Sequence, residues 1–456
     1  MKHGSITELE LSAGYTRRMR RKLPSLLIAI TLSGAPLLRQ SGFTPGPDGL
    51  PPGWRTWAAR AEIAPKTYIE QVHSLGEPGS LAVSGNSNAA AYGGWEYSVR
   101  GIEPGRWYRL TAWYRAEGLR YEPLQVLARL DWRTAKGGRA GQPDYAYQLE
   151  RYGEWRKVTL QAPAPEGAAE VVIQLYLANA PQGMVWWDEI SLEPAPDPGP
   201  RLVRVAALNF RPTNSASAAE NVRRFLEAAD KAIGGKVDLI LLPEGITLVG
   251  TGKKYADVAE PVPGPTTAKL SEYAKQRSAW VVAGIYERES PAIYNTAVVL
   301  DREGRLAGKY RKVYLPREEI EGGLTPGEDY PVFQTDFGKV GVMICWDLQY
   351  ADPARNLALR GAELILLPIW GGNEALAKAR AIENQVFLVA SGYDHPTYIL
   401  DPEGRTVAAA EQRGQAAIAE LDLNRRWVDK WLGWMRGRFM KELRLDLPVR
   451  RPGFEP

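Results

Sequence analysis

The stretch KVGVMICWDLQYADP, residues 339–353, decides the fold of the second half of the chain. Residues 340–344 are apolar without interruption, which is typical of a strand covered on both faces. Asp352 and Pro353 mark the start of a helix after it. Side chains at the carboxyl ends of parallel strands point into the crevice where α/β proteins bind ligands. The stretch therefore predicts an α/β layer architecture with Cys345 at its functional edge.

The same alternation of buried strands and helices extends over residues 201–423. It predicts strands at 202–208, 237–242 and 280–286 and helices at 216–232 and 266–276. Three short sequences also recur in the same order but at unequal spacing, which favours two pseudo-symmetric α/β units over a regular solenoid. The pairs are DLILLP (238–243) with ELILLP (363–368), VAGIY (282–286) with VASGY (389–393), and LDREGR (300–305) with LDPEGR (400–405).

Residues 42–193 follow a different period. Side chains alternate over 107–116 as in a half-buried antiparallel strand, and Gly/Pro-rich turns separate several such segments, so we expect a β-sandwich or jelly roll. With EWRKVTLQAP (154–163) and WWDEISLEP (186–194), this pattern resembles carbohydrate-binding, galactose-binding-like modules. The resemblance implies a carbohydrate ligand. The segment PAPDPGP, residues 194–200, has four prolines in seven residues and is expected to be a linker that does not pair in a sheet.

Trp95, Trp132 and Trp186 are the tryptophans considered for stacking on a sugar ring. Because tryptophans are usually highly buried, core packing is the stronger interpretation for each of them. No ligand residue is therefore assigned to this domain.

Residues 1–41 have the layout of an export signal. Residues 1–22 hold six basic and two acidic groups, and an apolar stretch follows at 23–38. Translation from Met19 would give a compact signal. We expect an exported protein, whether periplasmic, extracellular or tethered by an uncleaved leader. The alternative is a frayed amphipathic leader on a cytoplasmic protein.

Composition excludes several classes of protein. The net charge of +4 resides entirely in residues 1–22, so the remaining chain is neutral and is not expected to bind nucleic acid. One Cys and three His exclude a disulfide within the chain and argue against a zinc site.

Cys345 is the nucleophile that the sequence offers, and it needs a base and an anion stabiliser. Glu244 ends the apolar run DLILLPE, where a carboxylate is expensive to bury without a role. Lys312, in GKYRKVYLP (308–316), is the candidate cation, and Lys309 is its rival. A Cys345–His395 dyad of the protease type is the alternative.

Together LLPEG (241–245), YRKVYLP (310–316), EGGLTPG (321–327) and VGVMICWDLQY (340–350) resemble the nitrilase, or carbon–nitrogen hydrolase, superfamily. The resemblance implies an αββα sandwich, a catalytic triad of Glu244, Lys312 and Cys345, and neither a metal nor an organic cofactor.

A second family glutamate, which helps to position substrate or proton, falls on Glu321, with Glu318 and Glu319 close by in sequence. The family's RAxEN pattern stands at Arg380, Ala381, Glu383 and Asn384, read as a helix that supports the site. Many members have His two residues after the lysine, and this chain has Tyr314 there.

The function expected from this resemblance is amidase-type hydrolysis of a non-peptide carbon–nitrogen bond through a Cys345 thioester. Lys312 and the Trp346 N–H are the expected oxyanion donors, near a positive charge that lowers the thiol pKa. Trp346, Trp370 and Tyr393 are the candidate pocket residues. Acyl transfer to an amine and a catalytically inactive carbohydrate- or surface-binding protein are the alternatives.

The expected substrate is a small amide-like molecule, since an amide is preferred to a ureido acid or a nitrile. A homo-oligomer formed through the catalytic domain is also expected. Residues 424–456 form a C-terminal extension, whose basic, Trp-rich stretch is a candidate for covering a neighbouring subunit.

Overall fold

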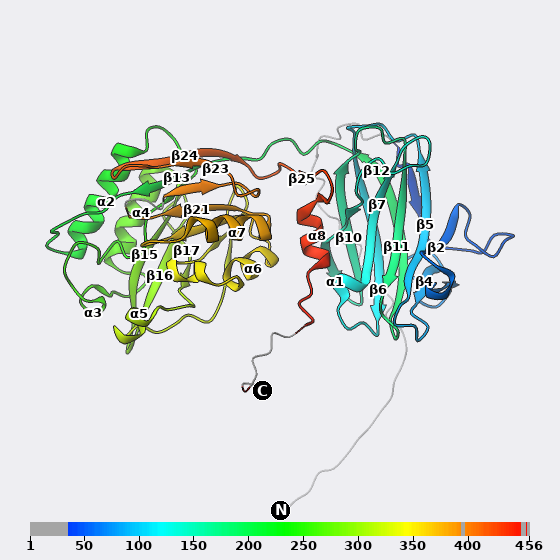
Figure 1. Ribbon diagram of the computed structural model, residues 1–456, viewed down its shortest axis with the longest axis horizontal. Helices are drawn as coiled ribbons and strands as arrows, with labels where there is room; N and C mark the ends of the chain where they lie inside the picture. The colour runs from blue at the N-terminus through cyan, green and yellow to red at the C-terminus, as the bar shows by residue number, and fades with distance from the viewer. Residues whose placement is uncertain (1–34, 394–396, 448–452, 454–456) are drawn as a thin grey trace, which may run out of the picture.

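The computed structural model describes residues 35–393, 397–447 and 453. Figure 1 shows two bodies at opposite ends of the long axis, a sandwich body (residues 38–195) and an α/β body (residues 202–422), with helix α8 (Met435–Glu442) between them. The predicted export signal lies mostly in residues 1–34, outside the described residues. Among the residues that are described, no helix is long and apolar enough to cross a membrane.

The sandwich body consists of two antiparallel sheets. The seven-stranded sheet contains β1 (Leu38–Gln40), β3 (Lys66–Glu70), β4 (Ser80–Ser84), β6 (Trp107–Glu117), β9 (Gln148–Tyr152), β10 (Trp155–Pro163) and β12 (Met184–Ala195). The five-stranded sheet runs in the order β2 (Trp54–Ala58), β5 (Tyr92–Arg100), β11 (Glu170–Ala178), β7 (Val126–Arg133) and β8 (Asp144–Tyr145). Two short helices, η1 (Ala61–Ile63) and α1 (Glu122–Gln125), interrupt the strands. The jelly-roll description stays a prediction.

One apolar cluster between these two sheets forms the core of the sandwich body. Trp95 and Trp132 belong to it and are 1% and 0% exposed, and Trp186 is 5% exposed. None of the three tryptophans considered for sugar stacking therefore presents its ring to solvent. Large aromatic side chains fill the space between the two sheets instead.

Two predicted boundaries of this body are wrong. β1 pairs with β12 and buries Leu38 in the core, so the body begins before residue 42. At the other end, Pro194 and Ala195 continue β12 opposite Tyr108 and Trp107, although the linker was expected not to pair. A proline is tolerated here because β1 and β4 end before it, so its missing N–H faces no neighbouring strand among the described residues.

The α/β body contains two six-stranded sheets. The first has the order β17 (Leu306–Arg311), β16 (Ala292–Leu300), β15 (Trp280–Glu289), β14 (Leu239–Leu241), β13 (Leu202–Asn209) and β24 (Gln415–Asp422). The second has the order β18 (Val332–Gln334), β19 (Lys339–Val342), β20 (Leu364–Pro368), β21 (Phe387–Ser391), β22 (Tyr398–Leu400) and β23 (Thr406–Ala409). The recurring sequences occupy equivalent places in the two sheets, at β14 and β20, at β15 and β21, and at the turns after β16 and β22.

Apolar clusters show how these layers pack. One cluster joins residues of both sheets, such as Val205, Val282, Val342 and Leu366, so the sheets lie face to face. A second cluster joins the first sheet to α2 (Ala218–Ala232) and α4 (Pro265–Arg277). A third joins the other sheet to α6 (Asp352–Leu359) and α7 (Glu374–Asn384). Helices thus cover the outer face of each sheet, and the carboxyl ends of β14 and β19 meet at one end of the body.

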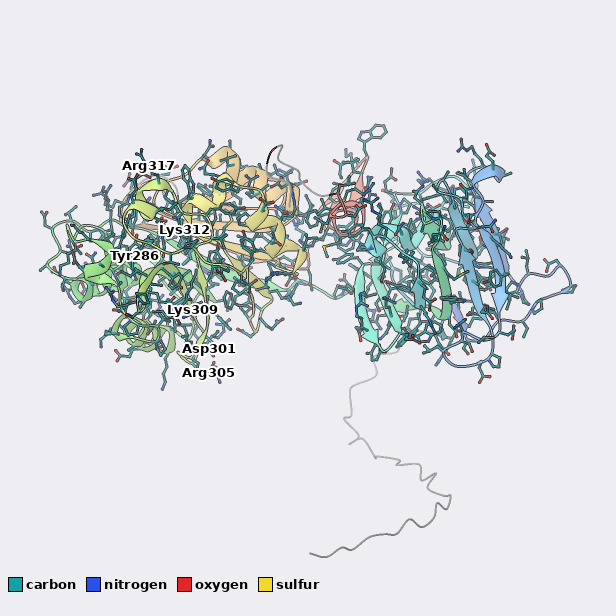
Figure 2. All side chains as sticks on the ribbon, turned by 90° about the horizontal axis from the view of Figure 1, so that it is seen from below. Tyr286, Asp301, Arg305, Lys309, Lys312 and Arg317 are labelled. Carbon is teal, nitrogen blue, oxygen red and sulfur yellow. The ribbon has the colours of Figure 1, made fainter. Side chains whose placement is uncertain are left out.

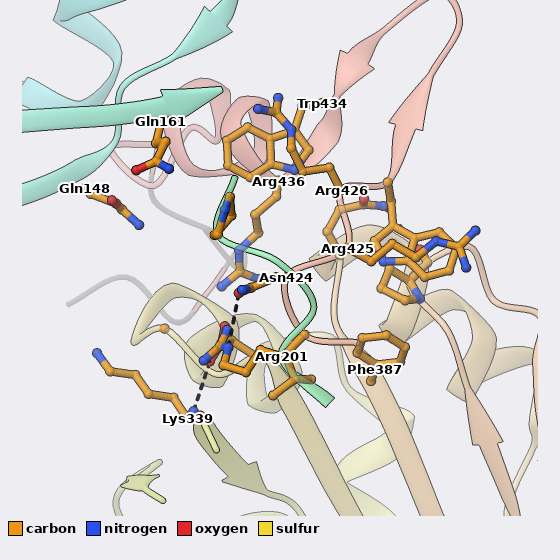
Figure 3. A pocket seen from close by; sticks show the side chains of 18 of the residues that line it. Gln148, Gln161, Arg201, Lys339, Phe387, Asn424, Arg425, Arg426, Trp434 and Arg436 are labelled. Atoms are coloured by element: carbon orange, nitrogen blue, oxygen red, sulfur yellow. Dashed lines mark hydrogen bonds and ion pairs between the residues drawn. The ribbon is translucent and has the colours of Figure 1, made fainter. Parts of the chain in front are cut away.

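The C-terminal segment (residues 424–447) lies between the two bodies of its own chain (Figure 1). It contains a hairpin of β25 (Val428–Asp429) and β26 (Gly433–Trp434), followed by α8. Arg436 of α8 donates to backbone carbonyls of the α/β body, and Lys441 Nζ donates to Val126 O of the sandwich body at 2.8 Å. A cavity of about 570 Å³ remains at this junction, lined by Gln161, Arg201 and Arg426 among others (Figure 3).

Candidate active site

Three separate segments bring Glu244, Lys312 and Cys345 together inside the α/β body, and Figure 2 shows Lys312 there, well away from the sandwich body. Glu244 follows β14, Lys312 directly follows β17, and Cys345 begins the short helix η2 (Cys345–Gln349) after β19. Gly284 allows the backbone of Glu244 to lie close to β15, because a Cβ at Gly284 would lie 2.6 Å from Glu244 Cα. The strand ends thus carry the polar side chains to one place.

Lys312 is the centre of this cluster. Its Nζ lies 3.0 Å from Glu244 Oε1 and 3.0 Å from Glu319 Oε1, and its side chain is only 1% exposed. Burial alone would lower the pKa of Lys312, but the nearby Glu244, Cys345 and Glu319 outweigh it and raise the pKa above its usual range. The site therefore favours the charged ammonium form of Lys312.

Asn295 on β16 ties the two carboxylates together. Its Nδ2 donates to Glu244 Oε1 at 2.7 Å and to Glu319 Oε1 at 2.8 Å, while its backbone carbonyl accepts from Lys312 N at 2.9 Å. The second oxygens of Glu244 and Glu319 are buried and have no hydrogen-bond partner among the described residues. These two carboxylate oxygens can therefore accept hydrogen bonds from a molecule bound in the site.

Cys345 sits in a strained turn beside this cluster. Its φ is +42°, in the left-handed region that a non-glycine residue adopts at a cost, and its Sγ lies 3.8 Å from Gly371 O. Burial and the Glu244 carboxylate raise the pKa of the thiol to about 12, and Lys312 only partly opposes them. Lys312 lowers the thiol pKa as expected, but burial and Glu244 outweigh its effect, so the net shift favours the thiol form of Cys345.

The structure places Glu319, and not the predicted Glu321, in the cluster. Both belong to α5 (Arg317–Glu321), but Glu319 is buried against Lys312 while the Glu321 side chain is 69% exposed and pairs loosely with Arg317. Residues two apart on a helix point to nearly opposite sides, so only one of the two can face Lys312. Burial, with a further contribution from Glu244, raises the pKa of Glu319 despite the opposing effect of Lys312.

Asp347 has a positioning role that the sequence reasoning missed. Its buried carboxylate accepts hydrogen bonds from Ile344 N at 2.7 Å, Tyr314 N at 2.9 Å and Tyr310 Oη at 2.7 Å. It therefore joins the turn of Cys345 to the residues on either side of Lys312. Burial raises the pKa of Asp347 to about 6. The available signal was a carboxylate two residues after the cysteine in CWDLQ.

Helix α7 supports the same turn. Arg380 Nη2 donates to Leu348 O at 3.2 Å and to Gln349 O at 3.4 Å, at the end of η2. Asn384 is buried and donates to Arg380 O at 2.9 Å. These contacts are those of a helix that holds the cysteine turn in place.

The three predicted pocket residues are placed differently. Tyr393 is buried and donates a short hydrogen bond from its hydroxyl to Glu244 O. Trp370 packs edge-on against Tyr393 at 4.9 Å between ring centroids and is 37% exposed. Trp346 follows the cysteine directly and is 38% exposed. Tyr314, at the position where the family has histidine, stacks on Tyr350 at 4.0 Å.

The rival residues lie elsewhere. Lys309 forms an ion pair with the buried Glu287 on β15, and among the described residues it forms no ion pair with Glu244 or Glu319. His395 lies outside the described residues. Within the described part of the chain, no three His, Cys, Asp or Glu side chains are grouped as metal ligands.

Comparison with known proteins identifies the family to which the α/β body belongs. A family model described as carbon-nitrogen hydrolase matches residues 204–427. An omega-amidase from Bos taurus is 30% identical over 241 residues, which are 46% of this chain and 86% of its own. A probable nitrilase from Schizosaccharomyces pombe is 34% identical over 202 residues, 40% of this chain and 74% of its own. The crystal structure of Saccharomyces cerevisiae Nit3 covers 56% of this chain and 97% of its own, at 23% identity and a TM-score of 0.44.

The chain therefore belongs to the carbon-nitrogen hydrolase family. It is an enzyme of the nitrilase superfamily. The alternative of a catalytically inactive binding protein is not supported.

Proposed function

We propose that this enzyme hydrolyses small carboxamides through a thioester on Cys345, with Glu244 as the general base and Lys312 as the oxyanion donor. The observation that carries the proposal is the position of Lys312 Nζ, 3.0 Å from each of two buried carboxylates and charged beside the only cysteine of the chain. A buried ammonium whose charged form the site favours is suited to the negative charge of a tetrahedral intermediate.

The first half of the reaction forms the thioester. Glu244 takes the thiol proton as Cys345 Sγ bonds to the amide carbon, and the carbonyl π electrons move to oxygen. Lys312 and the Trp346 N–H, at the start of η2 where helical N–H groups have no intrahelical partner, stabilise that oxyanion. When the carbonyl re-forms, the C–N bond breaks and the protonated Glu244 gives its proton to the leaving nitrogen.

The second half returns the enzyme to its starting state. Glu244 removes a proton from water, and the resulting hydroxide adds to the thioester carbon. Collapse of this intermediate breaks the C–S bond, and Glu244 returns the proton to sulfur, leaving a carboxylic acid and the resting thiol. The high thiol pKa fits this scheme, because proton transfer to Glu244 coincides with attack and no free thiolate accumulates.

Glu319 acts through Lys312 in this scheme. It shares the ammonium and Asn295 with Glu244, so it fixes the direction in which the ammonium points. The unpartnered Glu319 Oε2 is a candidate acceptor for an N–H of the substrate amide.

A substrate panel tests the proposal. Simple amides, ureido acids and nitriles are each incubated with the wild-type protein and with Cys345→Ala, and ammonia release is measured. We expect ammonia from amides with the wild-type protein and none with Cys345→Ala. Ammonia from amides at the same rate in Cys345→Ala would contradict the proposal.

Hydroxylamine gives an independent test of the thioester and addresses acyl transfer to amines. Added to the amide reaction, it should divert product from the acid to the hydroxamate without accelerating loss of the amide if formation of the thioester limits the rate. If no hydroxamate forms at any hydroxylamine concentration, an acyl-enzyme open to outside nucleophiles is ruled out.

A further inference from the structure

A second cavity lies in the sandwich body, on the outer face of the five-stranded sheet. Its volume is about 340 Å³, within the range of ~300–1,000 Å³ typical of small-ligand pockets. Residues of β2, β5, β11 and β7 line it, and none of them belongs to the site around Cys345.

The floor of this cavity is a row of polar side chains in strand register. Arg55, Glu96, Gln174 and Arg129 are cross-strand partners on four adjacent strands, so all four project from the same face. Arg55 Nη2 donates to Glu96 Oε2 at 2.7 Å, Gln174 Nε2 donates to Glu96 Oε1 at 2.8 Å, and Arg129 Nε donates to Gln174 Oε1 at 2.5 Å. Glu96 and Gln174 are 2% and 4% exposed, so the floor is fixed and sheltered although it faces outward.

An aromatic wall stands beside this row. Trp57, Gly94 and Tyr176 are register partners one step along the same face. Because Gly94 has no side chain, the indole of Trp57 lies across it and stacks on the Tyr176 ring, with centroids 5.4 Å apart and planes at 5°. Trp57 is nevertheless 37% exposed, so part of its ring is open to the cavity that it lines.

Four arginines line the cavity, and the carboxylates paired with them do not balance all of their charge. Arg55 pairs with Glu96, and both Arg133 and Arg139 pair with Asp131. Arg129 forms no ion pair with any described residue. Its guanidinium is held between aromatic rings, 5.1 Å from the Tyr176 centroid and 5.7 Å from that of Tyr145. A largely buried guanidinium without a carboxylate is expensive unless an anion joins it.

Two buried polar atoms of the cavity are suited to hydrogen bonds with hydroxyl groups of a ligand. Asp131 Oδ1 and Arg133 Nε are buried without a hydrogen-bond partner among the described residues, and they provide one acceptor and one donor from the same strand. A hydroxyl group both donates and accepts, so adjacent hydroxyls on a ring can satisfy such a pair after a small movement of side chains.

We propose that this cavity binds a sugar ring that carries a carboxylate, with the carboxylate on Arg129, the ring against Trp57 and the hydroxyls toward Asp131 and Arg133. The carboxylate of the ligand pairs with the guanidinium that has no ion pair, and the ring packs on the exposed part of the indole. The hydroxyls bind the two polar atoms that have no hydrogen-bond partner. The site is independent of the proposed amidase reaction, because it lies in the other body of the molecule.

Titration calorimetry on the full chain tests the proposal with the methyl glycosides of glucuronic and galacturonic acid. Methyl glucoside supplies the ring without the charge, and acetate and inorganic phosphate supply charge without the ring. We expect saturable binding of at least one uronide, about tenfold or more weaker binding of methyl glucoside, and no saturable binding of acetate or phosphate. If no uronide binds, or if acetate or methyl glucoside binds as tightly as the uronides, the proposal fails.

Two variants assign the binding to this cavity. Trp57→Ala and Arg129→Gln should each weaken uronide binding by about tenfold or more, because aromatic and arginine anchors dominate binding sites. The matched control is Trp431→Ala, which removes an indole that is 83% exposed in the C-terminal segment. Trp57→Ala changes an exposed residue, so it is expected to fold and to retain wild-type amide hydrolysis. Uronide binding at wild-type affinity in Trp57→Ala would overturn the proposal.

Discussion

At the scale of single residues, the proposed chemistry depends on one buried cation shared by two carboxylates. Lys312, Glu244 and Glu319 are each no more than 7% exposed at the side chain, so their charges interact with little screening by water. Asn295 adds hydrogen bonds to both carboxylates. Removing one member leaves the others buried and mispaired, so substitutions here should reduce catalysis far more than their size suggests.

The contrast between Glu319 and Glu321 gives a matched pair of variants. Glu319→Gln keeps the size of the side chain but removes the carboxylate from Lys312, and we expect it to lower kcat/KM for amide hydrolysis by about 100-fold through misplacement of the ammonium. Glu321→Gln changes an exposed residue of the same short helix and should leave the rate unchanged. The sequence assignment to Glu321 would be restored if the two variants behaved in the opposite way.

Sequence reasoning located residues better when a strand fixed them than when a short helix did. Glu244 and Cys345 each follow an apolar run that ends a buried strand, and such an end can be recognised in the sequence, whereas Lys312 follows the partly exposed β17 and was assigned from the family motif. Glu319 and Glu321 lie in a helix of only five residues, whose rotation is set by packing that has no local sequence signal. Asn295 was missed because its polar side chain stands inside an apolar strand and meets its partners only in three dimensions.

At the scale of elements, two similar sheets supply the two sides of the site. The first sheet provides Glu244 and Lys312, and the second provides Cys345. The recurring sequences predicted this pairing of α/β units, because they fall on equivalent strands. They did not predict α8, which occupies the junction between the bodies and carries a nearly buried lysine, Lys441.

Lys441 should make stability depend on pH. Burial lowers its pKa to about 8 from the ordinary 10.5, so between these values the unfolded chain binds a proton that the folded chain does not. The free energy of unfolding should therefore rise with pH across this window, by about 3 kcal/mol at most.

Calorimetric melting of the wild-type protein and of Lys441→Met between pH 7 and pH 10 measures this effect. The difference between the two proteins cancels the other titrating groups. The melting temperature of the wild-type protein should rise relative to that of Lys441→Met as the pH rises through 8. A difference in melting temperature that stays constant with pH would contradict the lowered pKa of Lys441.

At the scale of the whole molecule, the C-terminal segment joins the two bodies of one chain. Arg426 pairs with Asp144 of the sandwich body, and Arg436 donates to three carbonyls at the ends of α6 and α7. The expectation that this segment covers a neighbouring subunit was drawn from its basic, Trp-rich composition. A basic, Trp-rich composition indicates that a segment packs against another surface, but it does not show which one. In the structure this segment packs against the two bodies of its own chain.

Arg436→Ala should loosen this junction. The variant loses three charge-assisted hydrogen bonds to carbonyls at an interface, which costs about 2–5 kcal/mol. Small-angle scattering should then show a larger radius of gyration, and proteolysis should cut the C-terminal segment sooner. The control is Arg438→Ala on the same helix, which breaks a surface pair with Glu442 and a hydrogen bond to Leu432 O within the C-terminal segment. Identical scattering and proteolysis for both variants would contradict the conclusion that Arg436 helps the C-terminal segment to hold the two bodies together.

The most direct test of the central claim is the rate at which iodoacetamide alkylates Cys345 at pH 7, followed by intact-protein mass spectrometry. The chain has one cysteine, so a single adduct identifies the site. An ammonium beside a thiol lowers the thiol pKa by about 1–3 units, so Lys312→Met should slow alkylation by about 10- to 1,000-fold. Lys309→Met, which changes the lysine paired with Glu287, should react at the wild-type rate. Alkylation of Lys312→Met at the wild-type rate would show that this ammonium does not act on the sulfur, and the proposed mechanism would be wrong.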